Sequence, residues 1–131
     1  MGYSVSIARC PDYQEDAISA AIVRVLESLG GLGRFVKRGD RVLLKLNLLS
    51  PRTPDAAVTT HPALVRGVVH MVQDIGAIPL VGDSPGGRGT VSSYEHILQK
   101  TGIQSVIDDT GCESVCFDAA STMISSPSCT T

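Results

Sequence analysis

The sequence predicts an α/β fold in three layers, with a mainly parallel sheet between helices and Rossmann-like βαβ units. Strand-like segments alternate along the chain with segments whose apolar residues recur at helical spacing. This alternation is typical of right-handed crossover units, in which a helix connects two parallel strands. The expected elements are a strand at 3–9, a helix at 13–29, a strand at 41–49, a helix at 61–75, a strand at 77–83, a helix at 91–101, a short helix at 103–110 and a strand at 113–118.

The first crossover unit is predicted from the pattern of its apolar residues. Residues 3–9, YSVSIAR, alternate and are rich in β-branched side chains, and Asp12 follows them as a helix cap. Seven apolar residues then recur at helical spacing between Tyr13 and Leu29, where a glycine-rich turn ends the helix. The run RVLLKLNLL at 41–49 is almost continuously apolar, as expected of a strand covered on both faces.

Proline and glycine mark the later elements. Pro62 suits the first position of a helix, with Thr60 or His61 before it as the cap, and Gly76 ends the apolar pattern of this helix. A short apolar strand at 77–83 then runs into a glycine-rich loop. The helices and strands that follow repeat the same alternation, which supports the α/β class.

Length and composition indicate one folded domain. The chain has 131 residues, of which 43% are apolar and 18% charged, close to ordinary globular usage. Residues 1–118 are assigned to the amino-terminal part of one α/β domain. Residues 119–131 are polar and lack a period, so they are expected to form an irregular or disordered tail of a truncated product.

Charge and hydropathy argue against several kinds of partner. Eleven Lys and Arg face thirteen Asp and Glu, a net charge of −2, and the basic residues are scattered, which argues against nucleic acid. No apolar run approaches the ~18 residues of a membrane span, and no signal peptide is evident, so no membrane partner and a cytoplasmic location are expected. The four cysteines are too irregularly spaced to predict a disulfide framework or a metal site.

The end of the second expected strand carries two polar residues. A buried ammonium is costly, so Lys45 must reach water, a carboxylate or a bound anion. Asn47 lies two residues on and shares its face, where the amide can donate and accept. Each residue also has a structural interpretation, because Lys45 can extend along a sheet edge into water and Asn47 can bond its own backbone in a turn.

The segment Thr59-Thr60-His61 precedes the next helix. A helix start offers free N–H groups and a partial positive charge, which favour an anion. His61 is the candidate catalytic residue, because histidine can transfer protons near neutral pH. The same threonines also fit a simple helix cap, and that alternative stays open.

The loop after the third expected strand is the second candidate ligand site. Asp83 can orient a ligand hydroxyl, hold a cation or pair with Lys45, and Ser84 can donate a hydrogen bond. Gly86 and Gly87 allow close approach of the backbone, and Arg88 can clamp an anion. The string lacks the spacing of the Walker and dinucleotide motifs, and a simple glycine turn is the alternative. Because carboxyl ends of parallel strands meet at one edge, the two loops are expected to form one site.

These motifs resemble the family catalogued as domain of unknown function 362. Its members typically read Val-Leu-Leu-Lys-Pro-Asn, then Thr-Thr-His-Pro with a downstream Val-Arg, then Gly-Asp-Ser-Pro; here the match runs from about residue 3 to 118, with Leu46 in place of the usual proline. The resemblance singles out Lys45, Asn47, Thr59, Thr60, His61, Pro62, Arg66, Gly82, Asp83, Ser84, Pro85 and Gly86.

The resemblance also bears on cofactors. Many family members are longer and are joined to ferredoxin-like segments that bind four-iron, four-sulfur clusters. The corresponding cysteine run is not in this sequence, so cluster binding is not carried over to these residues and the cofactor stays unidentified.

Two functions follow as hypotheses, and neither decides whether the chain is an enzyme. In the first, the domain binds a small anionic ligand or cofactor at the carboxyl edge of the sheet, in redox-linked metabolism as the iron–sulfur fusions imply. In the second, it is a non-catalytic module that docks an iron–sulfur or other protein partner through Leu48 and Leu49. An inactive fragment that self-associates through an open sheet edge is the third interpretation.

Overall fold

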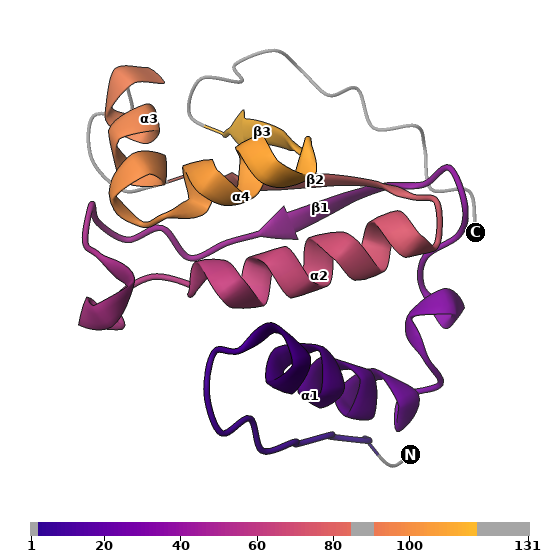
Figure 1. Ribbon diagram of the computed structural model, residues 1–131. Coiled ribbons are helices and arrows are strands. Elements are labelled where there is room, and N and C mark those ends of the chain that lie inside the picture. The colour runs from indigo at the N-terminus through magenta and orange to yellow at the C-terminus, as the bar shows by residue number, and fades with distance from the viewer. Residues whose placement is uncertain (1–2, 85–90, 118–131) are drawn as a thin grey trace.

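The computed structural model describes residues 3–84 and 91–117, and in these ranges the protein is a mixed α/β domain with four helices and a three-stranded parallel sheet (Figure 1). The strand order is β1-β2-β3. The elements are α1 (Glu15–Glu27), a 3-10 turn η1 (Leu32–Arg34), β1 (Arg41–Lys45), a second 3-10 turn η2 (Pro54–Ala56), α2 (Pro62–Asp74), β2 (Ile78–Asp83), α3 (Val91–Lys100), α4 (Ile103–Thr110) and β3 (Glu113–Cys116).

The parallel register brings the carboxyl ends of the three strands to one edge. Lys45 of β1 lies opposite Gly82 of β2, and Asp83 lies opposite Cys116 of β3. The prediction of parallel strands joined by helices is therefore confirmed for β1, β2 and β3.

The larger core lies between one face of the sheet and the helices α2, α3 and α4. Val81 at the centre of β2 is fully buried, as are Val69 of α2 and Ile103 of α4. Burying each such side chain contributes about 1.5–3 kcal/mol. The whole cluster comprises Leu46, Leu48, Val65, Val69, Val81, Tyr94, Ile97, Leu98, Ile103, Val106 and Cys112. A smaller cluster of Val36, Val72 and Ala77 continues it toward the other end of α2.

The opposite face of the sheet is more open in the described part of the chain. Because side chains alternate along a strand, Arg41, Leu43 and Lys45 point away from the core, and all three are exposed. In β2, Ile78 shares their face and is also exposed. Helix α1 packs on α2 and lies on the side of α2 away from the sheet (Figure 1). The prediction of helices on both faces is thus wrong for the described residues.

Residues 3–9 do not form the predicted first strand. Tyr3, Val5 and Ile7 are 96%, 84% and 91% exposed, and the segment is extended without a strand partner among the described residues. The alternating pattern gives β propensity, but a strand also needs a neighbour to receive its N–H and C=O groups. The described sheet therefore has three strands and not four.

The second predicted strand is shorter than its apolar run. β1 ends at Lys45 and not at residue 49, because the N–H groups of residues 47 and 48 donate to side chains and not to the backbone of β2. The Asn47 N–H donates to Thr60 Oγ1 and the Leu48 N–H to Asp83 Oδ2. The predicted helices begin or end within two residues of those observed, α4 matches at both ends, and the predicted tail at 119–131 lies outside the described residues.

Candidate functional site

An ion pair joins the ends of β1 and β2. Lys45 Nζ lies 2.6 Å from Asp83 Oδ1 and also donates to the Leu46 carbonyl oxygen at 2.5 Å. The side chain of Lys45 is 58% exposed, whereas that of Asp83 is 6% exposed. Of the three roles that the sequence left open for Asp83, the pairing with Lys45 is the one observed. The ammonium is thereby fixed at the edge of the sheet while part of it still faces water.

Asp83 is a buried carboxylate that stays ionised. Burial by itself raises the pKa of Asp83. Hydrogen bonds from Lys45 and from the backbone N–H groups of Leu48 and Ser84, together with the charge of Lys45, lower the pKa by more than burial raises it, so that it lies below its ordinary value. The Leu48 N–H reaches Asp83 Oδ2 at 2.6 Å. One carboxylate therefore ties the loop after β1 to the end of β2.

Asn47 and Thr60 meet at the base of the loop that connects β1 to α2. The Asn47 N–H donates to Thr60 Oγ1 at 3.1 Å, and the Thr60 N–H donates to the Asn47 carbonyl at 3.2 Å. This reciprocal pair closes the loop and brings the two predicted segments together, as the sequence indicated. Thr59 is half-buried beside them.

His61 is the cap of α2. Its Nδ1 accepts a hydrogen bond from the Ala63 N–H at 3.2 Å, and its carbonyl accepts from the N–H groups of Leu64 and Val65. Pro62 has no N–H. The first turn of α2 therefore uses its donors within the protein, which removes support for an anion bound by free N–H groups there. The cap is His61 itself and not Thr60.

The ring of His61 also stacks on Tyr13. The ring centroids are 3.6 Å apart and the planes differ by 13°. Because Nδ1 accepts a hydrogen bond, a neutral His61 carries its proton on Nε2 and can donate from there. The sequence did not indicate this contact, because Tyr13 precedes α1 and reaches His61 only through the packing of α1 on α2.

Two further residues contribute to the packing at this edge, of which the family resemblance singled out Gly82 and the sequence did not indicate Tyr94. Gly82 allows close packing, since a Cβ there would lie 2.7 Å from the Val115 carbonyl oxygen. Tyr94 of α3 is buried and donates from its hydroxyl to the same oxygen at 3.1 Å. Burial, with Cys116 and Asp83 nearby, raises the pKa of Tyr94 to about 12. In the sequence, Tyr94 is recognisable only as an apolar position of the helix.

The remaining candidates are dispersed or not described. Ser84 is exposed next to Asp83, but Gly86, Gly87 and Arg88 lie outside the described residues, as does Pro85. Arg66, which the family resemblance singled out, forms a 2.8 Å ion pair with Asp109 that ties α2 to α4.

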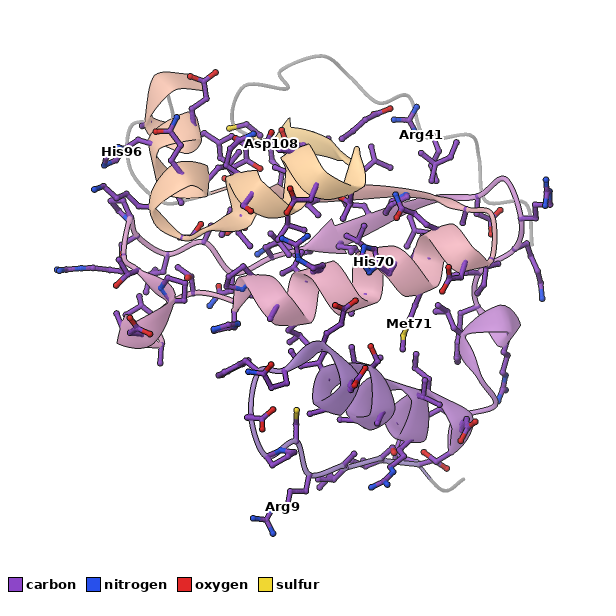
Figure 2. The ribbon with its side chains drawn as sticks, viewed as in Figure 1. Arg9, Arg41, His70, Met71, His96 and Asp108 are labelled. Atoms are coloured by element: carbon purple, nitrogen blue, oxygen red, sulfur yellow. The ribbon has the colours of Figure 1, made fainter. Side chains whose placement is uncertain are left out.

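The other two histidines lie on different helices and do not join the site. Figure 2 shows His70 on α2 and His96 on α3; His70 Nδ1 is 3.7 Å from Glu15 Oε1, and His96 is exposed. Within residues 3–84 and 91–117, no three His, Cys, Asp or Glu side chains gather as a metal site would require. In the same ranges, no helix has both the length and the apolar character needed to cross a membrane.

Comparison with known proteins places the chain in a family. The chain is 46% identical over 108 residues to the thylakoid-associated protein sll1697 of Synechocystis sp. (strain ATCC 27184 / PCC 6803 / Kazusa), an alignment that covers 79% of this chain and 34% of that protein. The chain thus spans about a third of the length of this curated relative. No solved structure matches this chain. Residues 42–130 match the family described as Domain of unknown function (DUF362), and the chain belongs to that family.

Proposed function

We propose that the carboxyl edge of β1 and β2 binds a small anionic ligand or cofactor, and that Lys45 supplies the central positive charge. The observation that carries the proposal is the asymmetry of the Lys45–Asp83 pair, in which the carboxylate is buried and the ammonium is more than half exposed. A fixed and partly solvated ammonium can contact an anion without first being immobilised, which lowers the entropy lost on binding.

The ion pair alone is neutral, so the proposal needs further donors. Thr60 lines the same groove as Lys45, and Asn47 is hydrogen-bonded to Thr60. His61 follows Thr60 directly in the chain and is included on that basis as a further donor through its Nε2–H. Ser84, Gly86, Gly87 and Arg88 follow Asp83 directly in the sequence and are included on that basis. Asp83 orients the ammonium of Lys45, and His61 binds the anion. No proton transfer and no reaction are assigned to either residue.

Phosphate titration provides the test. Inorganic phosphate, and separately malonate, is titrated into ¹⁵N-labelled protein, and backbone amide shifts are followed at constant ionic strength. We expect saturable shifts at residues 45–48 and 60–61, lost in Lys45→Met. The matched control is Arg41→Met, because Arg41 lies on the same strand and face and is also ion-paired, to Glu113 at 3.0 Å, but at the opposite end of the sheet. Equal loss in both variants, or no saturation by either anion, would contradict the proposal.

A docking module is the second candidate function, and the open sheet face favours it. Leu43 and Ile78 are 50% and 46% exposed on that face, and Leu49 is 65% exposed beyond the end of β1. Leu48, which was predicted to take part, is fully buried and cannot contact a partner. Capture of an iron–sulfur protein that survives Lys45→Met but is lost in Leu43→Asp would support docking over ligand binding.

We also propose a cellular location for the protein. A cytoplasmic location and a role in redox-linked metabolism are expected from the sequence and the family resemblance. The curated relative is named for an association with thylakoids. Fractionation of cells that express the tagged protein distinguishes a cytoplasmic from a membrane-associated pool.

A further inference from the structure

The outer edge of β1 presents backbone groups toward a side where the described residues place no strand. The Leu46 N–H donates to the Gly82 carbonyl, and the Asp40 carbonyl accepts from the Ile78 N–H. In a parallel pair, alternate residues direct both backbone groups to the same neighbour. The even-numbered residues of β1 therefore face β2, and Arg41, Leu43 and Lys45 direct their N–H and C=O groups to the outer edge.

An apolar groove of about 320 Å³ runs along this edge. It lies between β1 and α2, and its lining includes Leu43, Leu44 and Lys45 of the strand and Leu64, Val65 and Val68 of the helix. Proteins commonly protect an edge strand with free charges, but here Arg41 is paired with Glu113 and Lys45 with Asp83. An added strand would find apolar floor beneath it and backbone partners beside it.

Residues 3–9 have the complementary properties. Tyr3, Val5 and Ile7 are exposed by 84% or more and share one side of an extended segment. The other side leans on α1, where the Ser28 hydroxyl donates to the Ser6 hydroxyl at 2.6 Å. Three large apolar side chains at alternate positions form an exposed strip, which marks an interaction surface.

We propose that residues 3–9 of one copy of this chain add as a strand to the outer edge of β1 in a second copy. Tyr3, Val5 and Ile7 fill the groove between β1 and α2, and the backbone pairs with Leu43 and its neighbours. A second copy is the occupant because the chain's own segment lies beyond α1, with α1 and α2 between it and β1 (Figure 1). Strand addition of this kind gives affinity through backbone bonds and selectivity through alternate side chains.

Sedimentation velocity over a range of concentrations tests the proposal on the 131-residue chain. We expect a reversible dimer whose dissociation constant rises at least about tenfold in Ile7→Asp and in Leu43→Pro, since each removes an apolar contact or an outward N–H. Leu43→Pro spares the bonds to β2, because the Leu43 N–H points outward. The matched control is Phe35→Asp, which changes an apolar residue that is 60% exposed outside both surfaces.

The sedimentation results distinguish strand addition between two copies from other modes of association. A monomer at every concentration, or a dimer indifferent to Ile7→Asp and Leu43→Pro, overturns it. Circular dichroism establishes that each variant is folded; removal of residues 1–9 serves as a second variant, because the described part of this segment is exposed and lies outside both core clusters.

Cross-linking identifies which chain supplies the strand. Two differently tagged chains, Ile7→Cys and Leu64→Cys, are mixed and oxidised in a background where Cys10, which is exposed, and Cys129 are both replaced by serine. Leu64 is chosen because it lines the groove and is 40% exposed. A disulfide that joins the two tags is the expected result. A disulfide formed only within a single chain carrying both substitutions would show that the segment pairs with its own β1, and would overturn the proposal.

Discussion

Asp83 is the residue on which the carboxyl edge depends most. It is buried and accepts hydrogen bonds from groups on both sides, Lys45 and Leu48 before it and the Ser84 N–H after it. A buried carboxylate without these donors would lose the compensation for its desolvation. The same bonds that position Lys45 for an anion therefore also stabilise the fold.

Loss of Lys45 should destabilise the protein in a pH-dependent way. In the wild type the pKa of Asp83 lies below its ordinary value of 3.8, so its contribution to stability is present above that value and is lost as pH falls through the folded pKa. Lys45→Met leaves the buried carboxylate unpaired, which we expect to lower the free energy of unfolding by about 1 kcal/mol at pH 7, a figure discounted because the ammonium is more than half exposed.

Urea unfolding at pH 7 and at a series of lower pH values checks this expectation. The difference between wild type and Lys45→Met should shrink as the pH falls through the folded pKa of Asp83, because a protonated Asp83 no longer needs the cation. Arg41→Met is the control, since the exposed Arg41–Glu113 pair contributes at most about 1 kcal/mol. A difference that stays constant across the whole pH series would refute the role assigned to Asp83.

At the scale of single residues, sequence patterns predicted contacts that follow from parallel pairing. Lys45 and Asp83 end neighbouring strands, so their meeting could be anticipated once the strands were taken as parallel. The stacking of Tyr13 on His61 could not, because it depends on where α1 docks and no local pattern encodes that position. The sequence left both Thr60 and His61 open as the cap of α2, and the structure has His61 in that role although threonine is the more usual cap residue.

At the scale of elements, the close pairing of β2 with β3 depends on Gly82. A Cβ at this position would meet the Val115 carbonyl oxygen at 2.7 Å and the Phe117 ring at 2.8 Å. The carbonyl belongs to β3 and cannot retreat without disturbing the pairing of the two strands. Gly82 is therefore a packing requirement of the sheet as well as part of the family motif.

Gly82→Ala should lower the free energy of unfolding by about 2 kcal/mol, within the range observed for overpacked sites. The control is Gly33→Ala, because a Cβ at Gly33 meets nothing within 4 Å and should change stability by no more than about 0.5 kcal/mol. Thermal and urea unfolding of both variants provide the measurement. Equal stability of the two variants would mean that β3 shifts freely, contrary to the packing described.

The ends of elements were harder to predict than their existence, and the reason is physical. The apolar run at 41–49 continues past Lys45, yet β1 stops there because the side chains of Thr60 and Asp83 accept the N–H groups of residues 47 and 48. Residues 3–9 have strand character but lack a neighbouring strand among the described residues. In both cases a partner distant in sequence decides whether β propensity becomes a strand.

At the scale of the whole molecule, the protein is layered, and most of its buried apolar residues lie between the sheet and the helices α2, α3 and α4. The sheet with α2, α3 and α4 surrounds the fully buried residues Val69, Val81 and Ile103. Helix α1 adds only Ile18 to the buried set and rests on α2. Because local stability follows buried apolar contact, α1 is expected to open at lower free energy than the sheet.

Hydrogen exchange followed by mass spectrometry tests this difference. Amides of α1 should exchange faster than those of β2, and Gly67→Leu should accelerate α1 further, because a Cβ at Gly67 already lies 3.0 Å from Ile18 Cγ2 and 3.3 Å from Ile22 Cδ1. A weakening of the α1 contact by about 1.4 kcal/mol would raise exchange in α1 about tenfold while β2 keeps its protection. Gly67→Ala, with a smaller side chain, should give a smaller effect in the same helix. Equal acceleration in α1 and β2 would instead show that the molecule opens as one cooperative unit, in which α1 is as firmly held as the sheet.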